Sequence, residues 1–446
     1  MKEIKFKKIA EIIETRIFNG TYSPNSQLPP HRVLAQELAT TPVTIAKAYQ
    51  LLADKQLVES YVGKGTFVCG HSHLDEVIKA PDDEAEYNFS ILQPCLPLNV
   101  SALQTAMQRV SQRLQSDLIG YTEYSGHEIH RQAGVEWARH YGLTGGHAQN
   151  TLLTDGAQHA LSLVIEALTR PGDTIAVESL TYPGIIALAH QTGRQIVAVP
   201  SDAQGMSVQG LETVIEQAQP KLVIVIPSHQ NPTGITMPKV RREQIAAVIR
   251  KAHLWLIEDD IYSFLNAAII APISNLVPEY AFHISSLSKA ISPAMRCGYL
   301  KVPESQIAVI QSHIRTSIWL ASPLNFAIAS ALIQSGEAFK MSENQRQLAL
   351  TRQEMASQIL ADLEYTASGY HLWLKLPHRW SPERFVMEAK NRNIIVSSGS
   401  YFDVSNQGVE AIRLSLMAIA DETRLQQGLE MIRTLILCDM NTIFPF

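Results

Sequence analysis

The sequence has few cysteines and no long apolar segment, and each absence limits the class of protein. There are only four cysteines in 446 residues, at Cys69, Cys95, Cys297 and Cys438. They are too few and too scattered for a disulfide framework, so reduced thiols in the cytoplasm are expected. No window reaches the roughly 18 apolar residues that a membrane span needs, and acidic residues interrupt the basic start, which argues against a signal peptide. A hydrophobic content of 46% excludes global disorder.

The sequence also lacks an excess of basic charge, which at first argues against a nucleic-acid-binding protein. It has 37 Lys and Arg against 42 Asp and Glu, a net charge of -5. The distribution changes that conclusion: residues 1–70 carry nine basic and six acidic groups, residues 71–88 carry one and six, and the remaining 358 residues carry a net -3. The pattern predicts a small basic domain over residues 1–70, an acidic linker over residues 71–88 and a large domain over residues 89–446.

Three helical patterns follow one another near the N-terminus. Apolar side chains recur at helical spacing in the first, at Phe6, Ile9, Ile12, Ile13 and Ile17. Pro29-Pro30 opens the second, with Val33, Leu34 and Leu38 expected to face inward. In the third, Thr41 suits the N-cap and Pro42 the first helical position. The inward face of this third helix is expected to hold Ile45, Ala46, Tyr49 and Leu52.

A short hairpin is predicted after the third helix, with strands at Leu57-Val58 and Thr66-Phe67-Val68 around Gly63-Lys64-Gly65. Two helices joined by a short break can place the second one in a DNA major groove. A lysine in the hairpin turn suits a wing that lies against phosphates.

The run LPPHRVLAQELATTPVTIAKAYQLLADKQLVES…GKGTFV resembles the GntR family of bacterial winged helix-turn-helix regulators. The resemblance implies that DNA is contacted by Arg32, Thr44 and Lys47, and by Lys64 and Gly65 in the wing. Pro42 stands where the family often has arginine, so a bidentate guanine contact would be missing there. The alternative is a small helical domain with ordinary surface charges, which a net +3 alone would not exclude.

The large domain alternates helical patterns with short apolar runs such as Leu222–Ile226 and Leu254–Ile257. Such runs between helices predict an α/β fold with a largely parallel sheet. Ligands in such sheets bind beyond the carboxyl ends of the strands. Polar motifs occur there in a fixed order, at Thr154–Gln158, His229–Gly234, Glu258–Tyr262 and Ser285–Lys289, with Arg296 beyond.

This order of motifs resembles the fold-type I pyridoxal 5'-phosphate (PLP) enzymes of the aspartate aminotransferase superfamily, over roughly residues 89–446. The resemblance implies a mostly parallel sheet with a smaller C-terminal lobe, and a Schiff base between Lys289 and PLP. Asp259 would pair with the pyridinium nitrogen, while Asn231 and Tyr262 would hydrogen-bond the ring hydroxyl. The resemblance also implies ring stacking by Tyr182, and phosphate contacts from Gly156, Ala157, Ser286, Ser288, Arg296 and, across a homodimer interface, Tyr121.

Arg413, in the run Ile412–Leu416, matches the arginine that clamps a substrate carboxylate with its planar fork. Asp155 replaces a small hydroxyl residue, and we do not expect it to contact phosphate directly. Each of these residues taken alone has an ordinary structural explanation, so the inference depends on their joint order. The loosely spaced Cys69, His71 and His73 lack a fourth ligand, and no metal site is expected.

A GntR-type winged helix joined to an aminotransferase-like domain resembles the MocR subfamily of bacterial transcription factors. The resemblance implies a PLP-dependent, DNA-binding cytoplasmic regulator that acts as a homodimer on a double-stranded DNA operator. It would sense a small amine or amino acid by exchange at the Lys289 Schiff base, through differential affinity for two states. Two alternatives stay open: a working aminotransferase that uses Lys289, Asp259 and Tyr262 catalytically, and a degenerate scaffold that holds no cofactor.

Overall fold

The structure is a computed structural model of the chain. It describes residues 3–18, 21–22, 26–54, 57–61, 65–68, 86–405 and 407–438. The chain divides into two compact units, Met1–Asp75 and Glu76–Phe446. Within the described residues, no helix is both long enough and apolar enough to cross a membrane.

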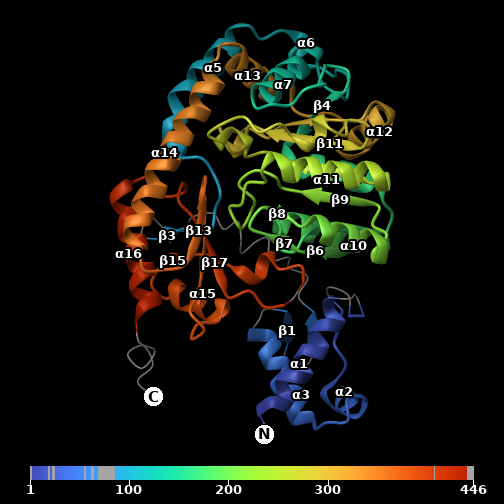
Figure 1. Cartoon of the computed structure of the whole chain (residues 1–446), viewed down its shortest axis with the longest axis vertical. Helices are drawn as coiled ribbons and strands as arrows, with labels where there is room; N and C mark the ends of the chain where they lie inside the picture. Colours follow the sequence, from blue (N-terminus) through green and yellow to red (C-terminus); the bar gives the residue numbers. More distant parts are fainter. Residues whose placement is uncertain are drawn as a thin grey trace. The chain divides into compact units, whose positions relative to one another are not determined.

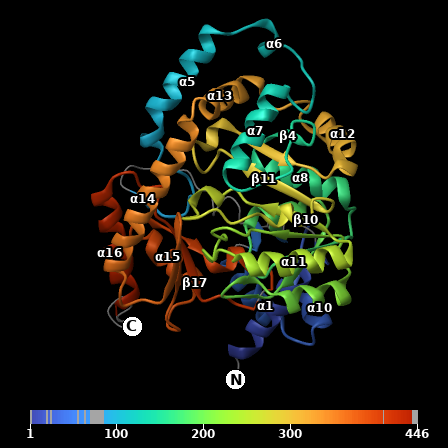
Figure 2. The ribbon, with the colours of Figure 1, turned by 45° about the horizontal axis from the view of Figure 1, so that its top comes forward.

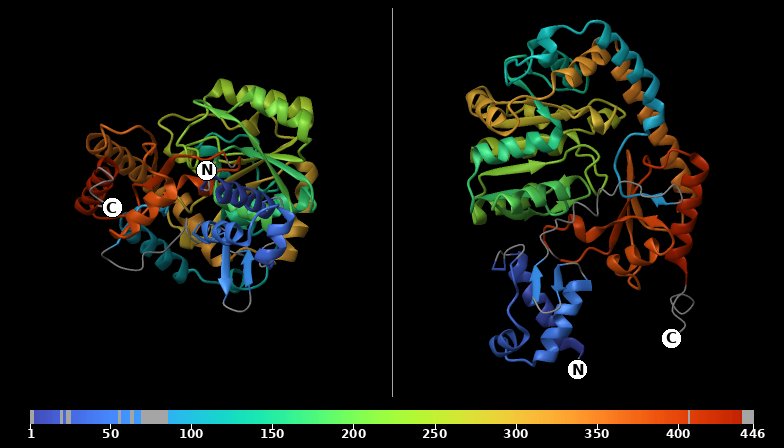
Figure 3. Two further views of the ribbon diagram at one scale, coloured as in Figure 1. Left: turned by 90° about the horizontal axis from the view of Figure 1, so that it is seen from below. Right: turned by 180° about the vertical axis from the view of Figure 1, so that it is seen from behind.

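The described residues of the N-terminal unit form three helices and an antiparallel hairpin, as the sequence predicted (Figure 3). Its elements are α1 (Glu3–Phe18), α2 (His31–Glu37), α3 (Pro42–Asp54), β1 (Val58–Tyr61) and β2 (Gly65–Val68). Val58 pairs with Val68 and Tyr61 with Gly65. The backbone N–H of Thr44 donates to Thr41 Oγ1 at 3.2 Å, so Thr41 caps α3 as expected.

The core of this unit is formed by one face of each helix. Ile13, Leu34, Ile45 and Leu52 are fully or almost fully buried. The prediction for Val33 was wrong, because its side chain is 54% exposed. Consecutive helical residues point about 100° apart, and the short α2 turns Leu34 and the next residue inward, which leaves Val33 outward.

The sheet of the large unit has seven strands and is mostly parallel, as predicted (Figure 1). In spatial order they are β4 (Thr151–Asp155), β12 (Cys297–Lys301), β11 (Ala281–Ser286), β10 (Trp255–Asp259), β9 (Leu222–Val225), β5 (Thr174–Glu178) and β6 (Gln195–Val199). Only β12 runs against its neighbours β11 and β4. The carboxyl ends of the other six strands therefore lie at one edge.

Helices cover both faces of this sheet (Figures 1 and 2). On one face pack α8 (Gly156–Leu168), α9 (Pro183–Gln191) and α12 (Ile307–Ser317). On the other pack α7 (Glu128–His140), α10 (Val208–Ala218) and α11 (Lys239–Ala252). Neighbouring strand residues point to opposite faces, yet both Val223 and Ile224 are buried. Burial on both faces explains why these strands read as continuous apolar runs.

A smaller lobe contains the C-terminal part of the chain. The long helix α14 (Glu337–Ile359) leads into it, and its antiparallel sheet has the order β13 (Tyr365–Ser368), β14 (His371–Lys375), β17 (Ala411–Ser415) and β16 (Ser397–Ser398). Its helices are α15 (Pro382–Lys390) and α16 (Glu422–Leu437). The strand β3 (Tyr87–Asn88) pairs with β15 (Ile394–Ile395) in this lobe. Residues 87–88, which the sequence assigned to the linker, therefore pair within the large unit.

The remaining elements are short or lie at the other end of the large unit. That end holds α5 (Val100–Gln112), α6 (Ser116–Ile119) and α13 (Pro323–Gln334), and α13 packs against α5, α6 and α7 (Figures 1 and 2). The short elements are the hairpin β7 (Ser201–Asp202) and β8 (Gly205–Met206) and the 3-10 turns η1 (Leu96–Asn99), η2 (Ser263–Leu265), η3 (Ile273–Asn275), η4 (Pro293–Met295), η5 (Glu304–Gln306) and η6 (Gly399–Phe402).

Candidate functional site

The residues predicted to hold the cofactor follow the ends of different strands. Gly156 follows β4, Asp259 ends β10, Ser286 ends β11, and Tyr182 comes a few residues after β5. Arg296 lies at the same edge, because it directly precedes the antiparallel β12. Parallel strands thus bring together residues that are more than 100 positions apart in the sequence.

Lys289 comes three residues after β11 and is half-buried. Its Nζ donates to the carbonyl oxygen of Leu92 at 2.6 Å. Burial lowers the pKa of Lys289 to about 8, and the nearby charge of Arg413 acts in the same direction. A lysine with a lowered pKa has a substantial neutral fraction and is a better nucleophile than an ordinary surface lysine.

Asp259 is a buried carboxylate that lacks a complete set of partners. Its side chain is 3% exposed, and Oδ1 has no hydrogen-bond partner among the described residues. Burial, reinforced by the charge of Asp260, raises the pKa of Asp259 to about 7. A buried polar atom without a partner is costly. The protonated ring nitrogen of PLP is the kind of donor that this oxygen would accept, so Asp259 fits the cofactor.

The start of α8 and the side chain of Arg296 form the part of the edge suited to phosphate. Gly156 has φ +75°, which favours glycine, and a Cβ there would lie 2.6 Å from Arg296 Nη2, so a side chain at this position would displace the Arg296 guanidinium. Ala157 follows in the first turn, where free backbone N–H groups favour anions. Ser286 Oγ lies 3.0 Å from Ser288 Oγ and accepts the backbone N–H of Ser288 at 3.1 Å. These residues fit the phosphate group of PLP.

Arg413 lies on β17 of the smaller lobe and is 2% exposed. Its Nη1 donates to Asn231 Oδ1 at 2.9 Å, and its Nη2 donates to Ser397 Oγ at 3.1 Å and to the Ser90 carbonyl. Its Nε has no partner within the described part of the chain. Burial lowers the pKa of Arg413 to about 10, so it stays cationic at neutral pH. The Asn231 oxygen is occupied by Arg413, which leaves the amide NH2 as the group that could face a ring oxygen.

The three tyrosines of the predicted set differ in exposure: Tyr262 is buried, Tyr182 is half-buried and Tyr121 is exposed. Burial raises the pKa of Tyr262 well above its usual range and that of Tyr182 to about 12, so both hydroxyls are neutral donors near pH 7. Tyr121 is 88% exposed, and its ring meets the edge of Trp319 at 6.0 Å between centroids. Within a single chain, Tyr121 is therefore not part of the candidate cofactor site.

The residues predicted to contact DNA have different exposures. Arg32 and Lys47 are exposed, whereas Thr44 is half-buried beside its hydrogen bond to Thr41. Gly65 has φ +106°, a backbone conformation that residues with a side chain rarely adopt. Lys64 lies outside the described residues, as do Cys69, His71 and His73.

Sequence reasoning missed two buried residues behind Asn231. Gln230 Nε2 donates to the Leu180 carbonyl at 2.7 Å and to Glu178 Oε2 at 3.3 Å, while its Oε1 accepts from Thr233 at 2.7 Å. Glu178 is 2% exposed, and burial raises its pKa to about 8. These contacts fix the turn that carries Asn231. The only sequence signal was the position of Gln230 inside the His229–Gly234 motif.

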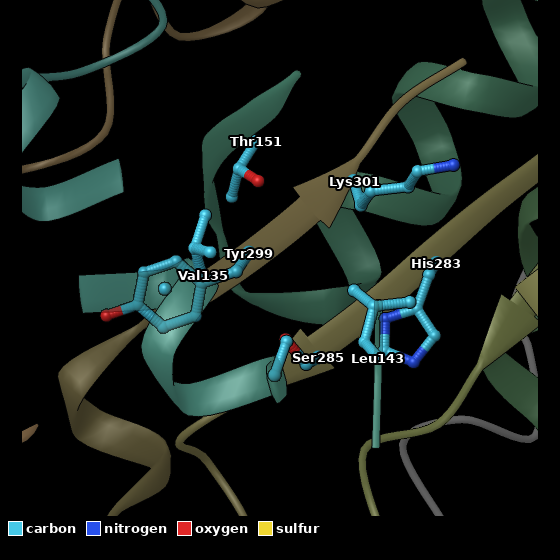
Figure 4. A pocket seen from close by; sticks show the side chains of 9 residues that line it. Val135, Leu143, Thr151, His283, Ser285, Tyr299 and Lys301 are labelled. Carbon is cyan, nitrogen blue, oxygen red and sulfur yellow. The ribbon is translucent and has the colours of Figure 1, made fainter. Parts of the chain in front are cut away.

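A small pocket lies between α7 and the sheet, and Figure 4 shows the side chains around it. Ser285 and Tyr299 are paired across β11 and β12, and neither hydroxyl has a hydrogen-bond partner among the described protein atoms. His283 and Lys301 form another pair along the same strands. Residues predicted to bind the cofactor do not line this pocket, so it is separate from the candidate site.

Comparison with known proteins matches each of the two parts of the chain to a family. The family "Aminotransferase class I and II" matches residues 87–432, and "Bacterial regulatory proteins, gntR family" matches residues 5–68. The chain is 28% identical to YdeF of Bacillus subtilis, an uncharacterized HTH-type transcriptional regulator, across 97% of this chain and 94% of that protein. It is also 28% identical to rat mitochondrial kynurenine/alpha-aminoadipate aminotransferase, across 68% of this chain and 76% of that protein.

The fold is shared with solved aminotransferase structures. One is LysN, an alpha-aminoadipate aminotransferase from Thermus thermophilus, complexed with N-(5'-phosphopyridoxyl)-L-leucine. It has a TM-score of 0.73 and 22% identity, and the match covers 79% of this chain and 92% of that chain. These matches confirm the predicted fold, the predicted two-part organisation of MocR-type regulators and PLP as the cofactor of the fold. The chain belongs to the class I and II aminotransferase family and carries an N-terminal domain of the gntR family of bacterial regulators.

Proposed function

We propose that this protein is a PLP-dependent transcriptional regulator that binds operator DNA and senses an amine or amino acid at the Lys289 site. The observation that carries the proposal is the similarity to an HTH-type regulator over 97% of the chain, which includes both units. A dedicated aminotransferase has no need of the N-terminal unit. DNA binding also supports a cytoplasmic location for the chain.

DNA binding in this proposal belongs to α2, to α3 and to the hairpin. Arg32 and Lys47 are exposed cations of the unit, and Thr44 lies in the first turn of α3. In a helix-turn-helix, the residues at the start of the second helix contact base edges. Gly65 would keep the wing narrow, and Lys64 would approach a phosphate. The start of α3 is Pro42, which cannot donate a hydrogen bond to a guanine.

Effector binding in this proposal belongs to the strand edge. PLP, when bound, supplies an aldehyde that condenses with primary amines and a ring that withdraws electrons. Lys289 contributes an amine whose pKa of about 8 keeps part of it neutral. Asp259 would hold the ring nitrogen, and Asn231 and Tyr262 would donate toward the ring oxygen. Arg413 offers the partnerless Nε and the edge of its guanidinium to an effector carboxylate.

A homodimer is the finer part of the proposal. Sixteen large hydrophobic side chains described in the large unit are exposed, and ten of them lie in residues 98–129 and 319–324. These segments surround α5, α6 and the start of α13, which pack together. An apolar face of this kind favours association, and it includes Tyr121, which would reach the partner's phosphate site. Two N-terminal units would then read paired half-sites.

Amino transfer is a second candidate function, and one observation favours it. Lys289, Asp259 and Tyr262 end or follow β11 and β10 at one strand edge, and the charge of Arg413 on β17 acts on Lys289, which supports the set of residues expected of an aminotransferase. The sequence similarity to the rat aminotransferase points the same way. The regulator proposal does not require turnover, and the two functions are separable by experiment.

The test is a titration of labelled DNA from upstream of the gene with the full chain, with and without PLP and a panel of amino acids. The expected result is a sequence-specific shift whose midpoint changes with PLP and with one class of amine. Lys289→Ala should bind DNA but lose the response and the visible absorbance of the bound cofactor. Rapid amino transfer to a keto acid, with no sequence-specific shift, would overturn the regulator proposal in favour of the enzyme.

A further inference from the structure

The phosphate end of the candidate site contains a carboxylate that already contacts the phosphate-binding arginine. Asp155 ends β4 directly before Gly156. Its Oδ1 lies 3.5 Å from Arg296 Nε, and its carbonyl oxygen accepts from Arg296 Nη2 at 2.8 Å. The two side chains are 50% and 45% exposed, so the pair lies at the open side of the edge. The described residues show no other ion pair of Arg296.

The backbone on both sides of this pair is fixed independently of the carboxylate. The N–H of Asp155 donates to His159 Nδ1 at 3.1 Å, and that histidine is in turn held by Ser317. Arg296 has φ +51° and follows the turn η4. Its guanidinium lies 2.6 Å from the position that a Cβ on Gly156 would take. Changing the Asp155 carboxylate alone should therefore leave the loop in place.

A phosphate that binds at the start of α8 would meet a cation and an anion together. Arg296 attracts a phosphate ester, whereas a carboxylate in contact with that arginine repels it and competes for the same N–H donors. A phosphate ester carries close to two negative charges at neutral pH. The small hydroxyl residue expected at position 155 would donate a hydrogen bond without adding charge.

We infer that Asp155 is an internal competitor for Arg296 that weakens the binding of phosphate-bearing ligands and makes the cofactor exchangeable. The inference rests on the proposed function, because it assumes that the phosphate of PLP binds at this edge. In an enzyme that keeps its cofactor through many turnovers, such repulsion is a disadvantage. In a regulator it allows the loaded fraction to follow the cofactor supply. A purely structural Asp155, which only orients Arg296, would have the opposite effect on affinity.

The experiment compares the full-length wild type with Asp155→Asn and Asp155→Ser. Free and bound ligand are measured by ultrafiltration of the apo protein, with PLP and with pyridoxal, which lacks the phosphate. The matched control is Asp202→Asn, which removes an ion pair with Arg241 from a carboxylate that is 51% exposed. Far-UV circular dichroism establishes that each variant is folded.

Both Asp155 variants should bind PLP more tightly, by about tenfold, while pyridoxal binding stays within about twofold of wild type. The gain should shrink at high salt, because screening weakens the repulsion between exposed charges. Asp202→Asn should match the wild type with both ligands. The inference is overturned if the Asp155 variants bind PLP no better or more weakly, or if PLP and pyridoxal gain equally.

PLP binding by the wild type distinguishes a failure at Asp155 from a failure of the proposed cofactor site. If the wild type bound PLP and the Asp155 variants gave the same affinity, the inference alone would be wrong. If neither the wild type nor the variants bound PLP, the assignment of the cofactor site would fail, and the inference would fail with it.

Discussion

Burial acts in opposite directions on the pKa values of Lys289 and Asp259. It lowers the pKa of the lysine to about 8 and raises that of the aspartic acid to about 7, so both groups titrate near neutral pH. The burial that causes these shifts does not stabilise the fold, because burying an ionisable group usually costs folding free energy. Perturbed pKa values that converge at a strand edge are typical of functional sites.

The first prediction concerns the pH dependence of Lys289 in the apo protein. Its pKa lies below the usual lysine value because burial disfavours the ammonium form, so the neutral fraction increases as pH rises through 8. Acylation of Lys289 by a small reagent should rise by about tenfold per pH unit up to pH 8 and then level off. Mass spectrometry of the Lys289 peptide, with free Nα-acetyl-lysine in the same tube, gives the profile. A profile that matches the free lysine would contradict the shift.

The second prediction concerns the planar fork of Arg413. Arg413→Lys keeps the positive charge but loses the paired N–H geometry, so effectors with a carboxylate should weaken by roughly 2 kcal/mol, or about thirtyfold. The matching amine without the carboxylate should change little. Titration of the visible absorbance of PLP-loaded protein with an amino acid and its decarboxylated amine measures both affinities. Equal losses for the two ligands would remove Arg413 from the effector site.

The sequence motifs identified candidate residues whose roles stay predictions, but they did not identify the residues that support them. Lys289 and Asp259 were predicted from motifs that lie at one strand edge, and Arg413 acts on Lys289 from β17 of the smaller lobe. Gln230 was missed because its partners, Glu178 and the Leu180 carbonyl, lie about 50 positions earlier in the chain. Contacts of that kind depend on strand order, which no local pattern specifies.

At the scale of helices and strands, local sequence patterns predicted an element correctly where its own residues determine its structure. Thr41 and Pro42 predicted the start of α3, and the apolar runs predicted β9 and β10. The inward direction of Val33 was wrong, because α2 is too short for its period to define a face. The strand β3 was missed because it has two residues and pairs with β15, about 300 positions away.

The third prediction tests the cap of α3. Thr41 Oγ1 accepts from the Thr44 backbone N–H, and its hydroxyl lies 2.8 Å from that of Thr44. Thr41→Ala should reduce the stability of α3 by about 1 kcal/mol, because the N–H loses its partner. Hydrogen exchange in the full chain should then show about fivefold less protection for amides in α3. Thr41→Ser keeps the oxygen and serves as the control, so an equal loss in both variants would argue against capping.

At the scale of the whole chain, function depends on two units with separate cores. The N-terminal unit has its own buried cluster, and the large unit has several. An effector can change DNA affinity only if it binds the two states of the protein differently. Association through the large unit would place two N-terminal units on one operator, so assembly and DNA binding should be coupled.

The last prediction uses the apolar face around α5, α6 and α13. Ile119 ends α6 and is 65% exposed, so a charge there should not disturb the fold of a single chain. If this face joins two copies, Ile119→Glu places two carboxylates in a symmetric interface and should shift the protein to monomer in sedimentation equilibrium. Operator affinity should fall by at least about tenfold, because two linked DNA contacts become one. Val240→Glu on α11, at a position that is 62% exposed, should leave both properties unchanged. A dimer that survives Ile119→Glu with full DNA affinity would place the interface elsewhere.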